Sequence, residues 1–416
     1  MSPSRVVRRA ARRRREKHGG GRRLGAVSLI FPLLGGCFSS APDGRATASA
    51  PVTAENVVSE YPGPAPLELS EEQDKLTRQA FERLKRTLAN LAQESRFAFG
   101  HQDTTAYGVG WSGDDDRSDV KSVCGSHPAV YGWDVFKVER GAPQNGDGVD
   151  FGLMRERIRD AYRRGGINTV SWHADNPVSG GDAWDTSAAV RAIIPGGSHH
   201  GVFRTYLDRV ADFLASCRGD RGELIPIIFR PFHEHTGSWF WWGRDHASNE
   251  DFVTLFRFTL DYLRETRRFS HLLFAFSPGG GDVRDLEDYL FRYPGDDYVD
   301  VMGLDHYYGA DASPMIRALG AAVAAADAHG KVPALTEFGV YRGFAEQDDA
   351  GASWFSRSFL EPMVESGTLA RIAYALAWRN ADDRHFFVPY PGHPAATDFA
   401  RFCADERVLL LRDLAP

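Results

Sequence analysis

Eight short apolar runs separated by amphipathic segments constrain this chain more than any other feature of its sequence. The runs are residues 97–102, 129–135, 167–173, 224–234, 271–278, 298–307, 332–339 and 372–380. Between them lie helix-like segments such as MRERIRDAYRR and FVTLFRFTLDYLRE. Near-continuous apolar strands that alternate with helices indicate a covered parallel sheet, and eight strands are the number that closes a barrel. We therefore expect an α/β fold, a single (β/α)8 TIM barrel. An open doubly wound sheet is the alternative, but no glycine-rich phosphate loop follows the first run.

The folded domain is expected over residues 67–416. Its first helix is predicted to start at Ser70, which can form a capping box with Gln73, and to continue to about Ala92. A hydrophobic content of 43% over 416 residues supplies enough apolar material for one large core.

The N-terminal segment has the pattern of a secretory signal. Residues 5–23 hold nine Arg and one Lys against one Glu, and the apolar stretch LGAVSLIFPLLGG follows directly. A basic region, a short apolar core and small residues describe a signal peptide. LLGGC is similar to a bacterial lipobox, which implies lipid attachment to Cys37 and removal of residues 1–36. Arg22-Arg23 as a twin-arginine signal and a misassigned start codon are the alternatives.

The segment after the signal is expected to be a tether. Residues 37–66 are rich in Ala, Ser and Pro without apolar periodicity, which is typical of a disordered linker. We expect a lipoprotein held to a bacterial membrane only through its anchor, at the cell surface or in the periplasm, and a monomer.

Charge and cysteine content exclude some function classes. Removal of residues 1–36 takes away ten Lys and Arg and one Glu, which leaves 39 basic and 55 acidic residues and a formal charge of −16. Such a surface does not suit a nucleic-acid binder and favours a neutral substrate. Cys124, Cys217 and Cys403 remain after Cys37, so at most one internal disulfide forms, and cysteine is expected neither to staple the fold nor to bind a metal.

Polar residues end almost every apolar run. The run ends are His101-Gln102-Asp103, Trp133-Asp134, Trp172-His173, His233-Glu234, Asp305-His306-Tyr307, Glu337 and Trp378-Arg379. In a parallel barrel the carboxyl ends of all strands meet at one mouth. Because buried polar groups are costly unless they are partnered, their repeated placement here predicts a shared polar pocket.

Two glutamates stand out in that pocket. Glu234 ends the fourth run and Glu337 ends the seventh, on opposite sides of the expected mouth. Glycoside hydrolysis needs one carboxylic acid to protonate the leaving oxygen and one carboxylate at the anomeric carbon. For a single strand-end Glu, a structural ion pair at the rim is the better explanation, but two that face each other beside aromatic residues favour the catalytic interpretation.

Four aromatic residues follow Glu234 in the segment SWFWW, residues 238–242. A flat apolar ring covers the C–H face of a sugar and leaves its hydroxyls free. We expect Trp239 to stack on a sugar and the other rings to pack in the core. His233 and His235 form an HxH pair that would point to one side of an extended strand, so a metal site is an alternative. Such a site needs further ligands on other strands, and His101, His173, His306 and Asp305 could serve.

Laid out in order, these strand ends resemble glycoside hydrolase family 26, best known for β-mannanases. The matching segments cover roughly residues 95–385 and are FGHQDTTAYG, VYGWDV, VSWHADNPVSGG, RPFHEHTGSWFWWG, GLDHYY, LTEFG and AWRN. The resemblance implies a catalytic domain over 67–416, with Glu234 as acid/base and Glu337 as nucleophile. It also implies that Tyr307 hydrogen-bonds the nucleophile and that His233 flanks the acid/base. Substrate-binding residues implied or expected at the mouth are His101, His173, Trp184, Trp239, Asp305, Trp378 and Arg379.

The implied reaction is retaining double displacement on a β-1,4-linked mannan or manno-oligosaccharide, with no cofactor and no metal. Glu234 must start protonated, and burial against Trp239 is the expected cause of a raised pKa. The two carboxyl groups are then expected about 5–5.5 Å apart. Mixed-linkage β-glucanase and β-1,3-xylanase activities, and a non-catalytic carbohydrate-binding barrel, stay open as alternatives. The preference for endo or exo cleavage and the tolerance of galactose branches are not readable from the sequence.

Overall fold

Eight parallel strands close into a barrel in the computed structural model, which describes residues 63–64, 67–347 and 349–414. The order is β10-β9-β8-β7-β6-β5-β4-β1, and β10 pairs with β1 to close the ring. The barrel strands are β1 (Phe97–Gln102), β4 (Val130–Asp134), β5 (Ile167–Trp172), β6 (Ile227–Pro231), β7 (Leu272–Phe276), β8 (Val301–Tyr308), β9 (Val332–Val340) and β10 (Tyr374–Ala377). Each strand corresponds to one of the eight predicted runs, and none extends more than one residue beyond its run. The predicted (β/α)8 barrel is therefore confirmed.

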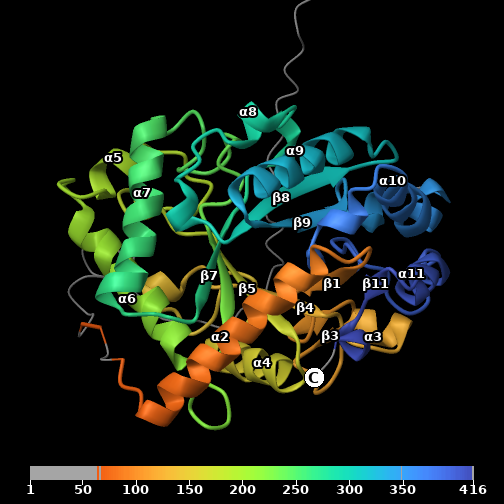
Figure 1. The fold of residues 1–416 in the computed structure, drawn as a ribbon, viewed down its shortest axis with the longest axis horizontal. Coiled ribbons are helices and arrows are strands. Elements are labelled where there is room, and N and C mark those ends of the chain that lie inside the picture. Colours follow the sequence, from red (N-terminus) through yellow and green to blue (C-terminus); the bar gives the residue numbers. More distant parts are fainter. Residues whose placement is uncertain (1–62, 65–66, 348, 415–416) are drawn as a thin grey trace, which may run out of the picture. The chain divides into compact units, whose positions relative to one another are not determined.

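Helices follow the strands and cover the outside of the barrel (Figure 1). They are α3 (Asp119–Cys124), α4 (Phe151–Arg163), α5 (Val190–Ile193), α6 (His200–Ser216), α7 (Asn249–Asp261), α8 (Leu286–Tyr289), α9 (Ser313–His329), α10 (Glu361–Glu365) and α11 (Ala396–Ala404). A π-helical stretch, Trp354–Leu360, leads into α10. None of the helices in the described part of the chain combines the length and apolar character that a membrane span needs.

Helix α2 (Glu71–Leu91) closes the amino-terminal end of the barrel. Ser70 and Gln73 form the predicted capping box at its start. Its buried residues Leu84, Leu88 and Leu91 pack in one cluster with residues at the starts of the strands, among them Ala98 and Ile167. Because one end of the barrel is plugged in this way, the opposite end, where the strands terminate, is left for a site.

Two small sheet features were not predicted. Tyr107–Gly108 (β2) and Trp111–Ser112 (β3) form an antiparallel pair after β1, and Val408–Leu409 (β11) pairs with the start of β1. Each of these strands is two residues long, too short to produce a hydrophobic period.

The cysteine prediction needs a correction. Cys124 at the end of α3 and Cys403 in α11 form a disulfide with their Cα atoms 5.9 Å apart and a sequence separation of 279. The limit of one disulfide holds, but cysteine does staple the fold by fixing its C-terminal helix to the segment after β1. Cys217 is buried and free. The predicted signal and Cys37, and the tether apart from residues 63–64, lie outside the described part of the chain.

Candidate active site

The chain leaves the strand conformation abruptly before Glu234. Strand β6 ends at Pro231, and both Phe232 and Glu234 have positive φ angles, 50° and 52°. Positive φ is uncommon outside glycine and is stored at functional sites. The turn is fixed by the Glu234 N–H, which donates to the Ser277 carbonyl at 2.7 Å, and by the Gly237 N–H, which donates to the Glu234 carbonyl at 2.9 Å. The backbone therefore holds the Glu234 carboxyl at the mouth.

This turn overturns the HxH interpretation. His233 and His235 do not share a face of an extended strand, because the backbone between them is not extended. The His235 ring is buried between Phe252 and Phe276, with centroids 4.7 and 4.8 Å away. Among the described residues, no three His, Cys, Asp or Glu side chains are grouped in a way that could hold a metal ion.

A β-bulge on β9 aims Glu337 into the barrel. Leu304 pairs with Leu335, but Asp305 pairs with Glu337, so Thr336 is the extra residue. Bulges re-aim side chains next to active sites. Here Thr336 donates to an Asp305 oxygen at 2.8 Å, while Phe338, the next residue on β9, turns outward to pack on Phe359.

Glu337 is held by two donors. Arg230 on β6 donates to one carboxylate oxygen at 2.6 Å, and the Tyr307 hydroxyl donates to the other at 2.6 Å. Arg230 also donates to Asp305 at 2.6 Å, so one buried guanidinium serves two carboxylates. Glu337 itself is only 5% exposed. The predicted hydrogen bond from Tyr307 is present, while Arg230 was not predicted as a site residue.

The environment of Glu234 favours its protonated form. Burial raises its pKa well above the ordinary value, and the negative charges of Glu337 and Asp305 raise it further. The Trp239 indole N–H donates to Glu234 Oε2 at 2.8 Å, which lowers the pKa. The raised pKa agrees with the expectation, but Trp239 opposes the shift through this bond. Burial and the charge of Glu337 also raise the pKa of Asp305, to about 7, although Arg230 lowers it.

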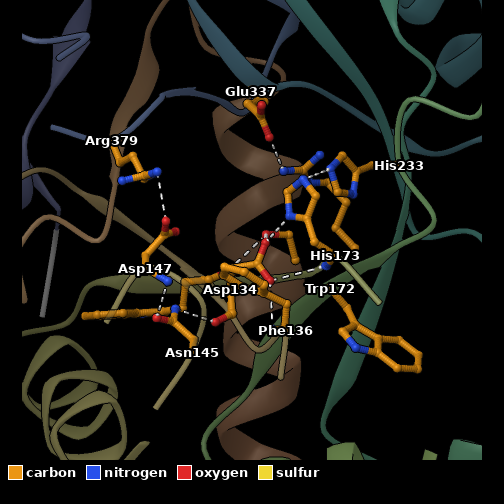
Figure 2. A network of polar contacts seen from close by, with 12 residues as sticks. Asp134, Phe136, Asn145, Asp147, Trp172, His173, His233, Glu337 and Arg379 are labelled. Atoms are coloured by element: carbon orange, nitrogen blue, oxygen red, sulfur yellow. Dashed lines mark hydrogen bonds and ion pairs between the residues drawn. The ribbon is translucent and has the colours of Figure 1, made fainter. Parts of the chain in front are cut away.

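His233 and His173 meet beneath the mouth. Their Nε2 atoms lie 3.1 Å apart, and His173 Nδ1 contacts the Asp134 carboxylate (Figure 2). His173 is buried at the end of β5, next to the ring of Trp378, with centroids 6.2 Å apart. These two histidines therefore form one polar unit, which also includes an aspartate that was not predicted as a site residue.

The aromatic residues divide as expected between the mouth and the core. Trp241 and Trp242 are fully buried, and Phe240 is nearly so, whereas Trp239 is half-buried. Trp184 is 47% exposed and lies parallel to the His173 ring, with centroids 5.3 Å apart. One face of Trp184 is thus occupied by His173.

Arg379 belongs to a separate polar cluster on the β1 and β4 side of the mouth. It forms an ion pair with Asp147 at 2.8 Å and donates to the Tyr107 hydroxyl at 3.4 Å (Figure 2 shows the Asp147 contact). Tyr107 in turn donates to Asp103 at 2.6 Å. Burial and the charge of Asp147 raise the pKa of Asp103 to about 8, against the lowering effects of Tyr107 and Arg379.

Two predicted substrate contacts are placed differently. His101 is 1% exposed and its Nδ1 lies 3.0 Å from the Thr104 hydroxyl, so it belongs to the buried layer behind the mouth. Asp305 is equally buried and engaged by Arg230 and Thr336. Neither side chain is open to a sugar. The sequence could not show this, because a position at a strand end does not tell whether a polar side chain faces the pocket or supports it from behind.

The arrangement joins a carboxyl group, Glu234, whose surroundings favour its protonated form, with a carboxylate, Glu337, that is paired to a buried cation. The first can donate a proton to a leaving oxygen and the second can attack a carbon centre. The rings of Trp184, Trp239 and Trp378 border the same site.

Comparison with known proteins identifies relatives of this chain. Residues 73–357 match the model of glycosyl hydrolase family 26. A mannan endo-1,4-beta-mannosidase from Bifidobacterium adolescentis is 34% identical over 352 residues, which are 80% of this chain and 34% of that protein. One from Bacillus subtilis is 28% identical over 199 residues, which cover 45% of this chain and 53% of that protein. The chain thus spans about a third to a half of these two relatives.

Solved structures extend the comparison to the fold. A family 26 β-mannanase from Bacteroides ovatus superimposes with a TM-score of 0.75 at 41% identity, covering 80% of this chain and 95% of that one. An endo-β-1,4-mannanase from Cellulomonas fimi superimposes with a TM-score of 0.72 at 39% identity, covering 80% and 76%. The chain belongs to glycosyl hydrolase family 26.

Proposed function

We propose that this protein is a retaining β-mannan hydrolase that cleaves β-1,4-mannosidic linkages. The observation that carries the proposal is the contrast between the two glutamates: burial and the charge of Glu337 favour the protonated form of Glu234, whereas Glu337 is paired with Arg230 and Tyr307. A pair of carboxyls with opposite protonation is what double displacement requires. The similarity to mannan endo-1,4-beta-mannosidases supports mannan as the substrate.

In the first step the Glu337 carboxylate attacks the anomeric carbon, and the bond to the leaving oxygen breaks as Glu234 donates its proton to that oxygen. The product is a glycosyl ester on Glu337 and a shortened saccharide. In the second step Glu234, now ionised, removes a proton from water, which attacks the anomeric carbon and releases Glu337. Arg230 and Tyr307 stabilise the Glu337 carboxylate when it leaves.

The test is a substrate panel. Wild-type protein is incubated with linear mannan, galactomannan, lichenan and β-1,3-xylan, and reducing ends are measured. We expect release from the mannans, loss of several orders of magnitude in Glu337→Ala, and full activity in Glu361→Ala, a matched change at an exposed residue of α10. Release only from lichenan or xylan would reassign the substrate, and binding without any release would indicate a non-catalytic carbohydrate-binding barrel.

We also propose that the mature protein is a bacterial lipoprotein anchored through Cys37. The support is the sequence LLGGC after a basic and apolar segment. Detergent phase partitioning of the protein expressed with its full N-terminus tests the anchor. We expect the wild type in the detergent phase and Cys37→Ser in the aqueous phase, and equal partitioning would rule the anchor out.

A further inference from the structure

Asp134 is a buried carboxylate at the end of β4 whose acceptor sites are occupied. One oxygen accepts the Phe136 N–H at 3.0 Å and the His173 N–H at 3.3 Å. The other accepts the Ser171 hydroxyl at 2.8 Å and contacts His173 Nδ1 (Figure 2). Asp134 as a whole residue is 1% exposed. An ionised carboxylate only accepts hydrogen bonds, so the proton at its contact with the imidazole lies on His173 Nδ1.

A buried charge needs a counter-charge, and His173 is the group that supplies it. A lone buried carboxylate is strongly unfavourable. Arg230 is engaged by Asp305 and Glu337, and Arg379 by Asp147. Burial alone would lower the pKa of His173, but the charge of Asp134 and its hydrogen bond raise it above the ordinary value. Burial would likewise raise the pKa of Asp134, but the charge of His173 and the hydrogen bonds from His173, Phe136 and Ser171 together lower it below the ordinary value.

The second nitrogen of His173 then has a defined role. Its Nε2 lies 3.1 Å from His233 Nε2, and one proton must lie between these atoms. Burial, together with the charges of Arg230 and His173, lowers the pKa of His233 well below its ordinary value, which favours the neutral form of His233. An imidazolium at His173 therefore donates its Nε2–H to His233, which carries its own proton on Nδ1.

We propose that Asp134 is a positioning residue of the active site, whose carboxylate keeps His173 doubly protonated so that its Nε2–H donates to His233, the neighbour of Glu234. The inference rests on the proposed hydrolase function. It places a positive charge opposite Glu337, whose charge acts on His173. It also gives Trp184 a cation beneath its ring, an attractive arrangement at this distance.

The charged and titratable groups around His173 come from three sides. Asp134 lies on β4 and Asp147 on the loop after it, and His173 influences both. His233 and Arg230 approach from β6, and Glu337 from β9. Of these groups, Asp134 alone shares a hydrogen bond with His173 Nδ1. Removal of the Asp134 carboxylate therefore takes away the hydrogen-bond partner of Nδ1 and leaves the contact of Nε2 in place.

The test compares the protonation of His173 in the wild type and in Asp134→Asn. Histidine side-chain ¹⁵N NMR of the whole protein measures this protonation across pH 5–9. The signal is assigned by its absence from His173→Gln. In the wild type we expect both ring nitrogens protonated at pH 6 and a pKa above the ordinary value. In Asp134→Asn, whose amide can donate to Nδ1, we expect an unprotonated Nδ1 and a pKa shifted down.

Asp175→Asn is the matched control. Asp175 is also buried, lies two residues from His173, and is paired with Lys137 at 2.7 Å and Arg140 at 2.8 Å rather than with His173. The His173 signal in this variant is expected to titrate as in the wild type. Circular dichroism melting checks that each variant is folded, and if Asp134→Asn does not fold, Asp134→Glu replaces it, with the displaced carboxylate expected to lower the His173 pKa by less.

Kinetics supply the second readout. Loss of a carboxylate that orients a functional histidine costs roughly 10–100-fold where it has been measured at metal sites, and we expect a loss of that order in kcat/KM for Asp134→Asn. A neutral His173 in the wild type at pH 6, or a His173 titration unchanged by Asp134→Asn, would overturn the proposal. If the wild type hydrolyses no polysaccharide, the proposed function fails, and the NMR result still decides the state of His173.

Discussion

Arg230 donates a 2.6 Å hydrogen bond to Glu337 from inside the barrel, where both side chains are buried. The same guanidinium donates to Asp305, and its planar fork can serve two carboxylates at once. A buried cation under the mouth thus fixes the carboxylate that the mechanism requires as nucleophile.

Replacement of Arg230 by Met is expected to abolish activity and to lower stability. Removing one partner of a buried ion pair costs about 3–5 kcal/mol, because it leaves uncompensated charge. Urea unfolding at pH 7 and steady-state kinetics measure the two effects. Arg230→Lys keeps the charge without the fork and is expected to lose less stability. A Met variant as stable and active as the wild type would remove Arg230 from the account.

The raised pKa of Glu234 predicts the alkaline limb of activity. Glu234 must donate a proton, so kcat/KM is expected to be maximal below its pKa and to fall as the pH rises through it. Glu234→Gln is expected to lose activity on mannan but to retain the first step on an aryl mannoside with a dinitrophenolate leaving group, which needs no acid. The pH profile of kcat/KM tests this expectation, and an alkaline limb that survives in Glu234→Gln on that aryl substrate would assign the limb to another group.

Stability gives an independent check of the same group. Because the folded pKa of Glu234 lies above its unfolded value, its contribution to stability is present below the unfolded pKa and is lost as the pH rises through the folded one. Glu234→Gln removes the group that must ionise. The Tm of Glu234→Gln relative to the wild type is therefore expected to increase with pH, and a constant or falling difference would contradict the assignment.

Removal of Trp184 is expected to change substrate binding, whereas removal of Trp242 is expected to change stability. Trp184 is exposed above His173, so Trp184→Ala should raise KM by roughly 2–10-fold, from the ~0.5–1.5 kcal/mol of a ring contact, with little change in Tm. Trp242 is fully buried, so Trp242→Ala should cost about 3–5 kcal/mol of stability. Kinetics on manno-oligosaccharides and thermal melting separate the two roles. A KM unchanged in Trp184→Ala would show that this ring does not contact the sugar.

The Cys124–Cys403 disulfide is expected to contribute stability rather than activity. Its loss in Cys403→Ser should lower the free energy of unfolding by about 2–4 kcal/mol, mainly by freeing the unfolded chain, with kcat at 25 °C retained. Urea unfolding compares this variant with Cys217→Ser, which removes a free thiol. Equal stability of the wild type and Cys403→Ser would show that the bridge does not hold the folded domain.

The barrel itself could be predicted because its buried strands are long enough to appear in the sequence as continuous apolar runs. The polar ends of those runs pointed to Glu234, Glu337 and Tyr307, because the carboxyl ends of parallel strands meet at one mouth. Local backbone departures could not be predicted in this way. The turn after Pro231 separates His233 from His235, and the bulge at Thr336 aims Glu337 inward; neither changes the hydrophobic period.

The buried residues that hold other site residues in position were also missed or misplaced by the sequence-based predictions. Arg230 lies within an apolar run, IIFRPF, and a charge at such a position signals buried carboxylate partners, so this signal was available in the sequence. Asp134 and Asp305 look alike as strand ends, and only their contacts tell that Asp134 holds His173 while Asp305 holds Arg230. His101 was expected at the pocket and lies behind it.

Mechanism-based labelling tests the central claim most directly. A 2-deoxy-2-fluoro-mannosyl substrate with a good leaving group slows the second step more than the first, so the glycosyl-enzyme accumulates and can be located by mass spectrometry of peptides. The account predicts one adduct, on Glu337 in the segment ALTEFG, and none in Glu337→Ala. An adduct on another carboxylate, or turnover without any adduct and with inversion at the anomeric carbon, would contradict it.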